Sequence, residues 1–268
     1  MSNNENLIKL ENLIDNFIKE QSKKYKNQTM LQRKINHIKR TASIAEENFE
    51  NNYILKIAMK FHDIGRFKQY DLIGSFNDKV FNHYILGIET INEYITTEDF
   101  KNTKELEMIK AVILYHSGVK YIPPNIELDC KTLELIDLAQ RIDALDNGCM
   151  GALIYIEEEC LNDSKKYKKN NPNMDMKTIS NDVLKFYLKG ETFDKLTYCN
   201  TYADYILFAA SLAIQSLKGA DKIIAKQIMN KKCGKYENAL VGYKDLFEKY
   251  IDSSKVSECM QCLYNYYN

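Results

Sequence analysis

Residues 53–67 have the sequence YILKIAMKFHDIGRF, in which apolar side chains recur at intervals of three and four. This spacing predicts an amphipathic helix over 53–64. Gly65 follows at a position where a glycine commonly ends a helix. Beyond it, the sequence predicts a loop that passes through Gly74 and Asn77.

The polar residues at the end of this predicted helix are directed toward the protein interior. His62 follows Leu55, Ala58 and Met59 at seven, four and three positions, which places its imidazole on the apolar face. Asp63 comes next, at the helix end. Asp63 is therefore a second candidate for an inward polar side chain.

The three other histidines of the chain show the same placement on predicted helices. His116 follows Ile109, Val112 and Ile113 at the same offsets, His37 shares a face with Ile44 and Ala45, and His83 shares a face with Leu86 and Ile91. Asp143 is also directed inward, because it comes seven residues after Ile136 and four after Ala139. An ionised carboxylate in a protein interior is costly unless it is paired or bound to a metal.

The residues alone leave two interpretations of this inward set open. A single buried histidine is most often neutral and hydrogen-bonded, with a purely structural role. Imidazole is also the commonest neutral metal ligand, and four imidazoles with two carboxylates from different helices would form a competent metal centre in a bundle core. Residue spacing does not separate these two interpretations.

The remainder of the chain is also predicted to be helical. Only 3 prolines and 10 glycines occur in 268 residues, and strand-like alternation with closely spaced turns is absent. The fold class is therefore all-α, and the polar stretch 162–176 is predicted to be a mobile connection. Besides 53–64, helices are expected at about 4–27, 30–50, 80–96, 103–116, 131–146, 177–188, 200–230 and 236–266, with Pro123 and Pro124 as an interruption.

Charge, hydropathy and cysteine content limit the classes of partner and location. Lys and Arg total 37, as do Asp and Glu, so generic nucleic-acid binding is not expected and any phosphate recognition must be local. The longest apolar run, Tyr205 to Ile214, is about half of the ~20 residues that cross a bilayer, so it predicts a buried helix and no membrane association. Seven cysteines are an odd number, which is unsuited to a disulfide framework and indicates reduced thiols. The polar N-terminus does not resemble a secretory signal, so a cytoplasmic location is expected. Cys259 and Cys262 form a CxxC pair, which is interpreted as two core or surface thiols rather than a zinc site.

The order His37, His62–Asp63, Asp143 resembles the H…HD…D signature of the HD-domain metal-dependent phosphohydrolase superfamily. Three local sequences strengthen the resemblance: FHDIGRF at 61–67 is similar to the HDIG-type motif, NHYILG at 82–87 looks like the HxxxG helix start, and LAQRIDAL at 138–145 resembles the last ligand helix. The resemblance covers about residues 30–150. It implies an HD-domain helical bundle with a helical C-terminal extension.

The resemblance also implies a set of metal ligands. His37, His62, Asp63 and Asp143 match the four ligands of the family's first metal. In members with two metals the counterpart of Asp63 bridges both ions, and His83 and His116 fit the places of the histidines that complete the second site. A two-metal centre is therefore preferred to a one-metal centre. The sequence YHSGVKY at 115–121 lacks the HHxxxDGxGYP pattern of cyclic-dinucleotide members, so the GYP subfamily and a third metal are not expected.

The implied activity is hydrolysis of a phosphate ester, of a nucleotide or related small molecule, through a metal-bound hydroxide. A mixed nitrogen and oxygen ligand set suits Mn, Fe, Co, Ni or Zn better than Mg. Asp63 and Arg66 are the expected catalytic residues, with Arg66 as a clamp for a substrate phosphate. An arginine that pairs with a nearby acid is an equally open interpretation. Asp146 and Asn82 are candidates to orient ligand side chains, and Arg141 is expected in a structural ion pair.

Two other functions are compatible with the same residues. Some HD-domain oxygenases use this scaffold and ligand set to hold two irons, and a non-catalytic module could sense a nucleotide in the same pocket. Arg66 after the HDIG-type motif favours phosphate chemistry. Residues 1–160 are predicted to form the metal-binding core with its N-terminal helix, and 161–268 a helical region that packs on it. A homo-oligomer is compatible with a helix-rich chain of this size, although the sequence identifies no interface.

Overall fold

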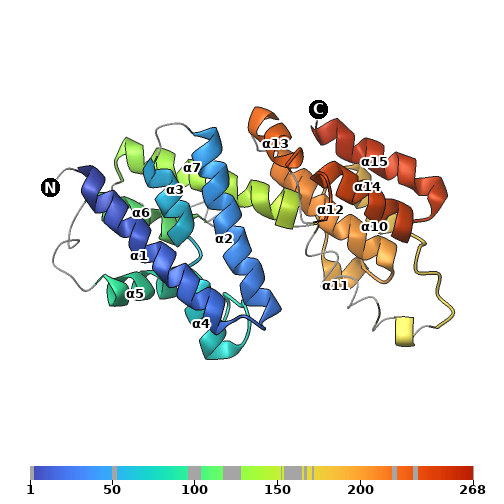
Figure 1. Cartoon of the computed structure of the whole chain (residues 1–268). Coiled ribbons are helices and arrows are strands. Elements are labelled where there is room, and N and C mark those ends of the chain that lie inside the picture. Colours follow the sequence, from blue (N-terminus) through green and yellow to red (C-terminus); the bar gives the residue numbers. More distant parts are fainter. Residues whose placement is uncertain are drawn as a thin grey trace. The chain divides into compact units, whose positions relative to one another are not determined.

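The computed structural model describes residues 3–49, 53–95, 104–116, 128–151, 153, 165, 168–170, 172–218, 222–231 and 235–267. All regular elements in these residues are helices, which confirms the all-α prediction (Figure 1). The chain divides into two compact units, Met1–Asp143 and Ala144–Asn268. No helix in the described part of the chain is long and apolar enough to cross a membrane.

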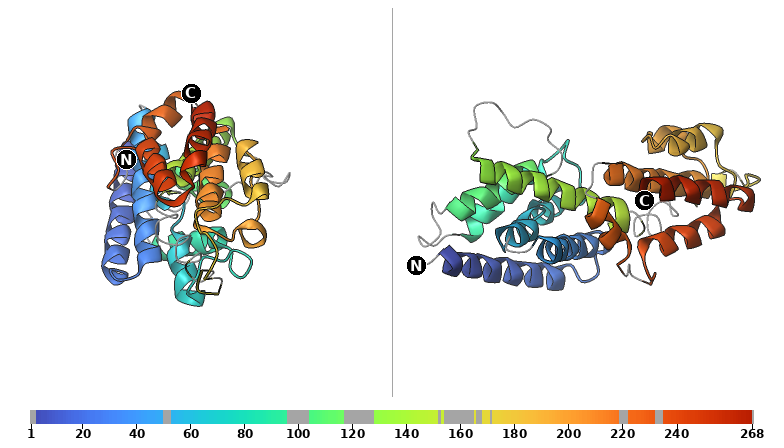
Figure 2. Two further views of the ribbon diagram at one scale, coloured as in Figure 1. Left: turned by 90° about the vertical axis from the view of Figure 1, so that its right-hand side faces the viewer. Right: turned by 90° about the horizontal axis from the view of Figure 1, so that it is seen from above.

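Helix α3 (Tyr53–Phe61) lies at the centre of the first unit, where it packs against α1, α2 and α6 (Figures 1 and 2). Its apolar spacing explains this position, because most of its side chains are buried. Because α3 ends within the core, the two residues that follow it, His62 and Asp63, are also buried. The other helices of the unit are α1 (Asn3–Lys24), α2 (Thr29–Asn48), α4 (Gly65–Ile73), α5 (His83–Tyr94), α6 (Lys104–Tyr115) and most of α7 (Cys130–Asp146).

Gly65 has a different role from the one predicted. It begins α4 instead of ending the preceding helix, and it is Gly74, with a φ of 65°, that ends α4 in the left-handed conformation. A Cβ on Gly65 would lie 2.0 Å from the carbonyl oxygen of His83 and 2.4 Å from the amide nitrogen of Gly87. Glycine is therefore required for the close approach of α4 and α5, and this long-range contact leaves no local pattern in the sequence.

Helix α5 begins at His83, later than the predicted start at residue 80, because Asn82 caps it. The Asn82 side chain accepts a hydrogen bond from the amide of Tyr84 at 2.9 Å. This is a usual role of asparagine before a helix. Asn82, predicted as a residue that orients a ligand, thus fixes the helix turn that starts with His83.

Helix α12 (Tyr202–Lys218) is the central element of the second unit and packs against α10, α14 and α15. It contains the apolar run Tyr205–Ile214, most of which is buried, as predicted. The other elements are the π-helix η2 (Asn147–Gly151), α10 (Asn181–Leu188), α11 (Lys195–Tyr198), α13 (Lys222–Met229), α14 (Ala239–Tyr250) and α15 (Ser253–Tyr267).

One long helix predicted in this unit, 236–266, is divided into α14 and α15. The predicted helix 200–230 contains α12 and α13, and residues 219–221 between them lie outside the described residues. Asp252 accounts for the division between α14 and α15, because its carboxylate accepts hydrogen bonds from the amide of Ser254 at 2.9 Å and from its hydroxyl at 2.6 Å. These bonds start a new helix. Four polar residues, 252–255, separate Ile251 from the next apolar residue, Val256, so the intervals of three and four are interrupted at the break.

The boundary between the two compact units lies in α7, between Asp143 and Ala144. The Asp143 carboxylate contacts His37 and His62 of the first unit. The domain boundary expected after residue 160 lies outside the described residues and stays a prediction.

The predicted connection 162–176 is only partly described: residues 162–164, 166, 167 and 171 lie outside the described residues, as do Pro123 and Pro124. Within the described part, the Lys168 amine donates to the carbonyl oxygens of Pro172 at 2.7 Å and Met174 at 2.6 Å. Lys168 therefore has a local structural role.

The CxxC pair consists of two buried thiols, as predicted. Cys259 and Cys262 both lie in the core of the second unit. Burial raises the pKa of the Cys259 thiol to about 12. The Cys262 thiol lies 3.4 Å from the carbonyl oxygen of Tyr187, as a donor. Protonated core thiols suit packing rather than metal binding.

Asp204 is a fully buried carboxylate that should be important for the stability of the second unit. It accepts hydrogen bonds from the amide and hydroxyl of Ser180, at 2.8 and 2.7 Å, and from the amides of Asn200 and Thr201. Asp204→Ala leaves these donors without their acceptor, so we expect a loss of roughly 2–4 kcal/mol in the free energy of unfolding. Urea unfolding followed by circular dichroism measures this change in the free energy of unfolding.

The matched control is Asp194→Ala, which removes an exposed carboxylate at the start of α11. Its loss should lower the free energy of unfolding much less than Asp204→Ala does, because water replaces the exposed cap. Equal effects of the two substitutions would contradict the importance assigned to Asp204.

Candidate metal centre

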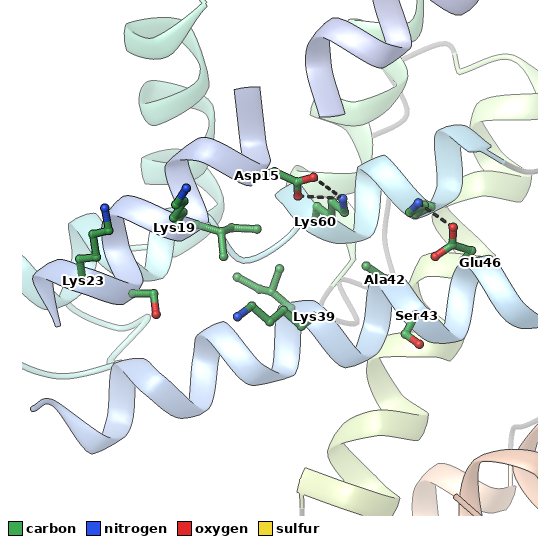
Figure 3. A pocket seen from close by; sticks show the side chains of 12 residues that line it. Asp15, Lys19, Lys23, Lys39, Ala42, Ser43, Glu46 and Lys60 are labelled. Atoms are coloured by element: carbon green, nitrogen blue, oxygen red, sulfur yellow. Dashed lines mark hydrogen bonds and ion pairs between the residues drawn. The ribbon is translucent and has the colours of Figure 1, made fainter. Parts of the chain in front are cut away.

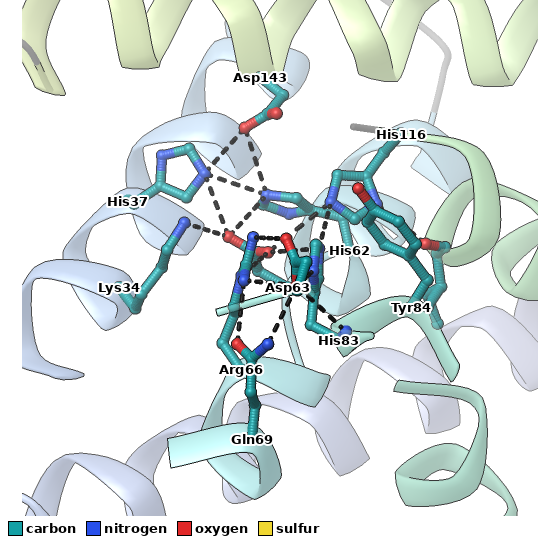
Figure 4. A network of polar contacts seen from close by, with 12 residues as sticks. Lys34, His37, His62, Asp63, Arg66, Gln69, His83, Tyr84, His116 and Asp143 are labelled. Atoms are coloured by element: carbon teal, nitrogen blue, oxygen red, sulfur yellow. Dashed lines mark hydrogen bonds and ion pairs between the residues drawn. The ribbon is translucent and has the colours of Figure 1, made fainter. Parts of the chain in front are cut away.

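All six predicted ligands converge in one place in the first unit (Figure 4). They come from α2, from the turn after α3, from the start of α5, from the residue after α6 and from α7. The Asp143 side chain is 15% exposed, and the others are buried. The residues are His37, His62, Asp63, His83, His116 and Asp143.

The first group of potential ligands is formed by His37, His62 and Asp63, whose nearest ligand atoms lie within 4.8 Å of one another. Asp63 Oδ2 is 3.6 Å from the Nε2 atom of each of these histidines, and the two Nε2 atoms are 3.1 Å apart. Asp143 Oδ1 adjoins the group at 3.0 Å from His37 Nε2 and 3.6 Å from His62 Nε2. These are the four residues that the resemblance assigns to a first metal.

The second group is formed by Asp63, His83 and His116. Here it is Asp63 Oδ1 that faces the imidazoles, at 3.5 Å from His83 Nε2 and 3.7 Å from His116 Nε2. The two Nε2 atoms are 3.5 Å apart. Asp63 therefore presents one carboxylate oxygen to each pair of histidines, which is the arrangement of a bridging ligand.

Hydrogen bonds on the far side of the rings fix the tautomers of three histidines. His62 Nδ1 lies 2.7 Å from the carbonyl oxygen of Met59, and His116 Nδ1 lies 3.0 Å from that of Ile113. His83 Nδ1 lies 2.6 Å from a carboxylate oxygen of Asp78. These oxygens can only accept, so each Nδ1 carries the proton and each Nε2 presents a lone pair to the cluster.

This arrangement fits a cation. In the second group, two Nε2 lone pairs and a carboxylate oxygen face one another without a proton between them, which is unfavourable unless a positive ion lies there. The separations are also suitable, because atoms bound to one metal at about 2.1 Å are about 3.0 Å apart in an octahedron and about 3.4 Å apart in a tetrahedron. The structure thus contains a His/Asp cluster that could hold a metal ion.

The protonation states agree with metal binding. Burial lowers the pKa of His83 to about 4 and also lowers the pKa of His62. Burial alone would raise the pKa of the Asp63 carboxyl, but neighbouring positive charge, chiefly that of Lys34, outweighs it and holds this pKa well below its usual range. For Asp143 burial is likewise outweighed, here chiefly by a hydrogen bond from His37, so its pKa is also well below the usual range. Neutral imidazoles and ionised carboxylates are the forms that bind metals.

Arg66 is placed beside the cluster but is already bound to an acid. Its guanidinium forms two hydrogen bonds with Asp78, at 2.9 and 3.1 Å, and a third with the Gln69 side chain at 2.9 Å. Its Nε atom lies 3.4 Å from Asp63 Oδ1. Of the two interpretations from the sequence, the structure therefore shows the arginine paired with a nearby acid, and its role as a phosphate clamp stays a prediction.

The sequence did not identify Asp78 and Lys34. Asp78 lies in the loop before α5, where no periodic pattern marks it, and it joins Arg66 to His83. Lys34 lies on α2, three residues before His37, and its Nζ atom is 2.5 Å from Asp63 Oδ2 (Figure 4). The spacing from His37 could have indicated Lys34, because residues three apart share a helix face.

Two further predictions concern α7. Arg141 pairs with Asp137 at 2.8 Å, which confirms its structural ion pair. Asp146 is fully buried, and its proposed role of orienting a ligand histidine stays a prediction.

A separate hollow of about 540 Å³ lies between α1, α2 and α3 (Figure 3). It is lined partly by lysines, among them Lys60, which pairs with Asp15 at 2.7 Å. None of the six clustered ligands lines it. The His/Asp cluster and this hollow are therefore two separate sites in the first unit.

Asp78 should control the metal affinity of the second group, because it fixes the ring orientation and tautomer of His83. Asp78→Ala is expected to weaken Mn²⁺ binding about 10–100-fold, as is typical when a carboxylate behind a ligand histidine is removed. Isothermal titration calorimetry on the metal-free protein measures this. Asp71→Ala, at an exposed carboxylate of α4 that pairs with Lys24, is the control and should leave Mn²⁺ affinity unchanged. If Asp78→Ala matched wild type, the orienting role would be wrong.

The geometry is the basis for assigning a function, since known proteins supply no assignment. No protein-family model, no curated protein and no solved structure matches this chain.

Proposed function

We propose that the protein is a metal-dependent phosphohydrolase that cleaves a phosphate ester of a nucleotide or a related small molecule. The observation that carries the proposal is the position of Asp63, with one carboxylate oxygen facing His37 and His62 and the other facing His83 and His116. Such a shared carboxylate suits a pair of neighbouring divalent ions. Pairs of this kind are common in enzymes that hydrolyse phosphate esters.

The donor set favours Mn, Fe, Co, Ni or Zn over Mg, because imidazole nitrogens suit these ions better. Bound divalent ions would activate water as a nucleophile and neutralise charge on the phosphoryl oxygens. Asp63, His37 and His83 would hold the ions, and the ring hydrogen bonds described above keep the ligand atoms in place. The ligand atoms of each group already lie within 4.8 Å of one another, so the histidines need to move little.

The charges around the cluster support an anionic substrate. Lys34 and Arg66 both lie within 3.5 Å of Asp63, at 2.5 and 3.4 Å. The chain as a whole carries no net charge, so this positive charge is local. A local cluster suits one phosphate group of a small molecule better than the extended backbone of a nucleic acid.

The test is phosphate release from a panel of nucleotides, together with hydrolysis of a chromogenic phosphodiester, in the presence of Mn²⁺. Wild type should hydrolyse at least one substrate, chelation of the metal should stop the reaction, and Asp63→Ala should be inactive. The matched control is Asp137→Ala, an exposed carboxylate on α7 outside the cluster, which should behave as wild type. Wild type no faster than Asp63→Ala on every substrate would rule the proposal out.

The same experiment separates the alternative functions. Oxygen uptake by the iron-loaded protein, without release of phosphate, would favour a di-iron oxygenase. Tight nucleotide binding without turnover under any metal would favour a sensing module.

A further inference from the structure

The Lys34 amine is paired with the Asp63 oxygen to which a metal ion in the first group would bind. Its Nζ atom is 2.5 Å from Asp63 Oδ2, the same oxygen that lies 3.6 Å from His37 Nε2 and from His62 Nε2. An ammonium group and a divalent cation repel each other strongly at such separations. A metal ion in the first group would therefore displace the Lys34 amine from Asp63.

The displaced amine would remain close to the centre. Lys34 lies on the face of α2 that carries His37, and Figure 4 shows its side chain directed at Asp63 from that helix. Its four-carbon stem lets the charge move by a few ångströms without any backbone change. The side chain is 21% exposed, more than any other described side chain that ion-pairs with Asp63, so solvent can reach it.

Arg66 is less available for the same task. Two of its nitrogens are bound to Asp78, and Gln69 accepts a further hydrogen bond from it. To bind a substrate phosphate through these nitrogens, Arg66 would have to give up the pair that also supports His83 through Asp78. Lys34 has only to leave an oxygen that the metal would take over.

We propose that Lys34 is an exchangeable cation, which is the counterion of Asp63 in the metal-free protein and binds a phosphoryl oxygen of the substrate once metal has displaced it. This proposal rests on the proposed function and adds the residue that recognises the phosphate. It makes Lys34 a substrate-binding residue, whereas Arg66 positions Asp78 and, through it, His83. The exchange predicts two effects of opposite sign when the charge is removed.

The experiment uses the full chain and the variants Lys34→Met, Lys34→Gln and Lys34→Arg. Loss of the competing ammonium in Lys34→Met should tighten Mn²⁺ binding to the metal-free protein on the order of tenfold. In the Mn²⁺-loaded protein, the same substitution should weaken the binding of inorganic phosphate on the order of tenfold, because a charge-assisted hydrogen bond is lost. Lys34→Arg keeps the charge and should retain phosphate affinity. Calorimetric titration gives both affinities without turnover.

Lys39→Met is the matched control, because Lys39 is exposed on the same helix and lies on the separate hollow of Figure 3. It should change neither affinity. A purely structural role of Lys34 would move both affinities in the same direction, and that result, or unchanged phosphate affinity in Lys34→Met and Lys34→Gln, overturns the proposal. Absence of hydrolysis with both binding effects present would count against the proposed activity alone.

Discussion

In the proposed two-metal phosphohydrolase, replacing Asp63 with asparagine is expected to remove both metal ions together and to abolish activity. The amide keeps the size of the side chain but loses the charge that both histidine pairs face, at Oδ1 and at Oδ2. Metal assistance contributes several kcal/mol to phosphate ester hydrolysis, so the loss in kcat/KM should be on the order of 1000-fold or more. Elemental analysis of the purified protein, with anomalous scattering at the site, gives the ion content.

Single histidine substitutions should separate the two groups of ligands. His37→Ala removes a ligand of the first group alone and His83→Ala a ligand of the second, so each should lower the metal content by about one ion. Asp137→Ala again serves as the control. If Asp63→Asn kept one tightly bound ion, or if either histidine variant lost both, Asp63 would not be a bridging ligand.

The second large effect is expected at Gly65, far from any chemistry of its own. Gly65→Ala places a Cβ 2.0 Å from the His83 carbonyl oxygen and 2.4 Å from the Gly87 amide nitrogen. Both are backbone atoms, so α4 and α5 must separate. We expect a loss of roughly 3 kcal/mol or more in the free energy of unfolding. Because His83 is the first residue of α5, metal binding by the second group should also weaken.

Gly74→Ala is the matched control for this prediction. Gly74 ends the same helix with a φ of 65°, and no atom lies within 4 Å of an added Cβ. The cost there is only that of a left-handed conformation, about 1 kcal/mol. Urea unfolding compares the free energies of unfolding of the two variants, and Mn²⁺ titration compares their metal affinities. A Gly65→Ala protein as stable as Gly74→Ala would show that the close approach of α4 and α5 is not required.

The contrast between Gly65 and His62 shows what local patterns can predict. The inward direction of His62 follows from neighbours three, four and seven residues away, and all of them are on the same helix. Gly65 was assigned to a helix end because glycine is common there, but its real constraint comes from backbone atoms of residues 83 and 87. No neighbour along the chain carries that information.

Asp78, Arg66 and Lys34 illustrate the same limit at the candidate metal centre. The sequence indicated that Arg66 was close to Asp63, but not that Asp78 would bind its guanidinium. A loop residue has no periodicity from which its direction could be predicted. Lys34 differs, because it precedes His37 by three residues and its face could be predicted, although its contact with Asp63 could not.

The sequence by itself determined that the chain is helical and which side chains helix spacing turns inward: His37, His62, His83, His116 and Asp143, with Asp63 as a candidate at a helix end. Helix periodicity fixes direction relative to the apolar face, and this depends only on residues a few positions away. Only the tertiary structure decided that these side chains meet, that Asp63 gives one oxygen to each histidine pair, and that Asp78 and Lys34 join them. These facts depend on the packing of α2, α3, α5, α6 and α7, because distances between helices are set by side-chain volumes and close backbone contacts from distant parts of the chain.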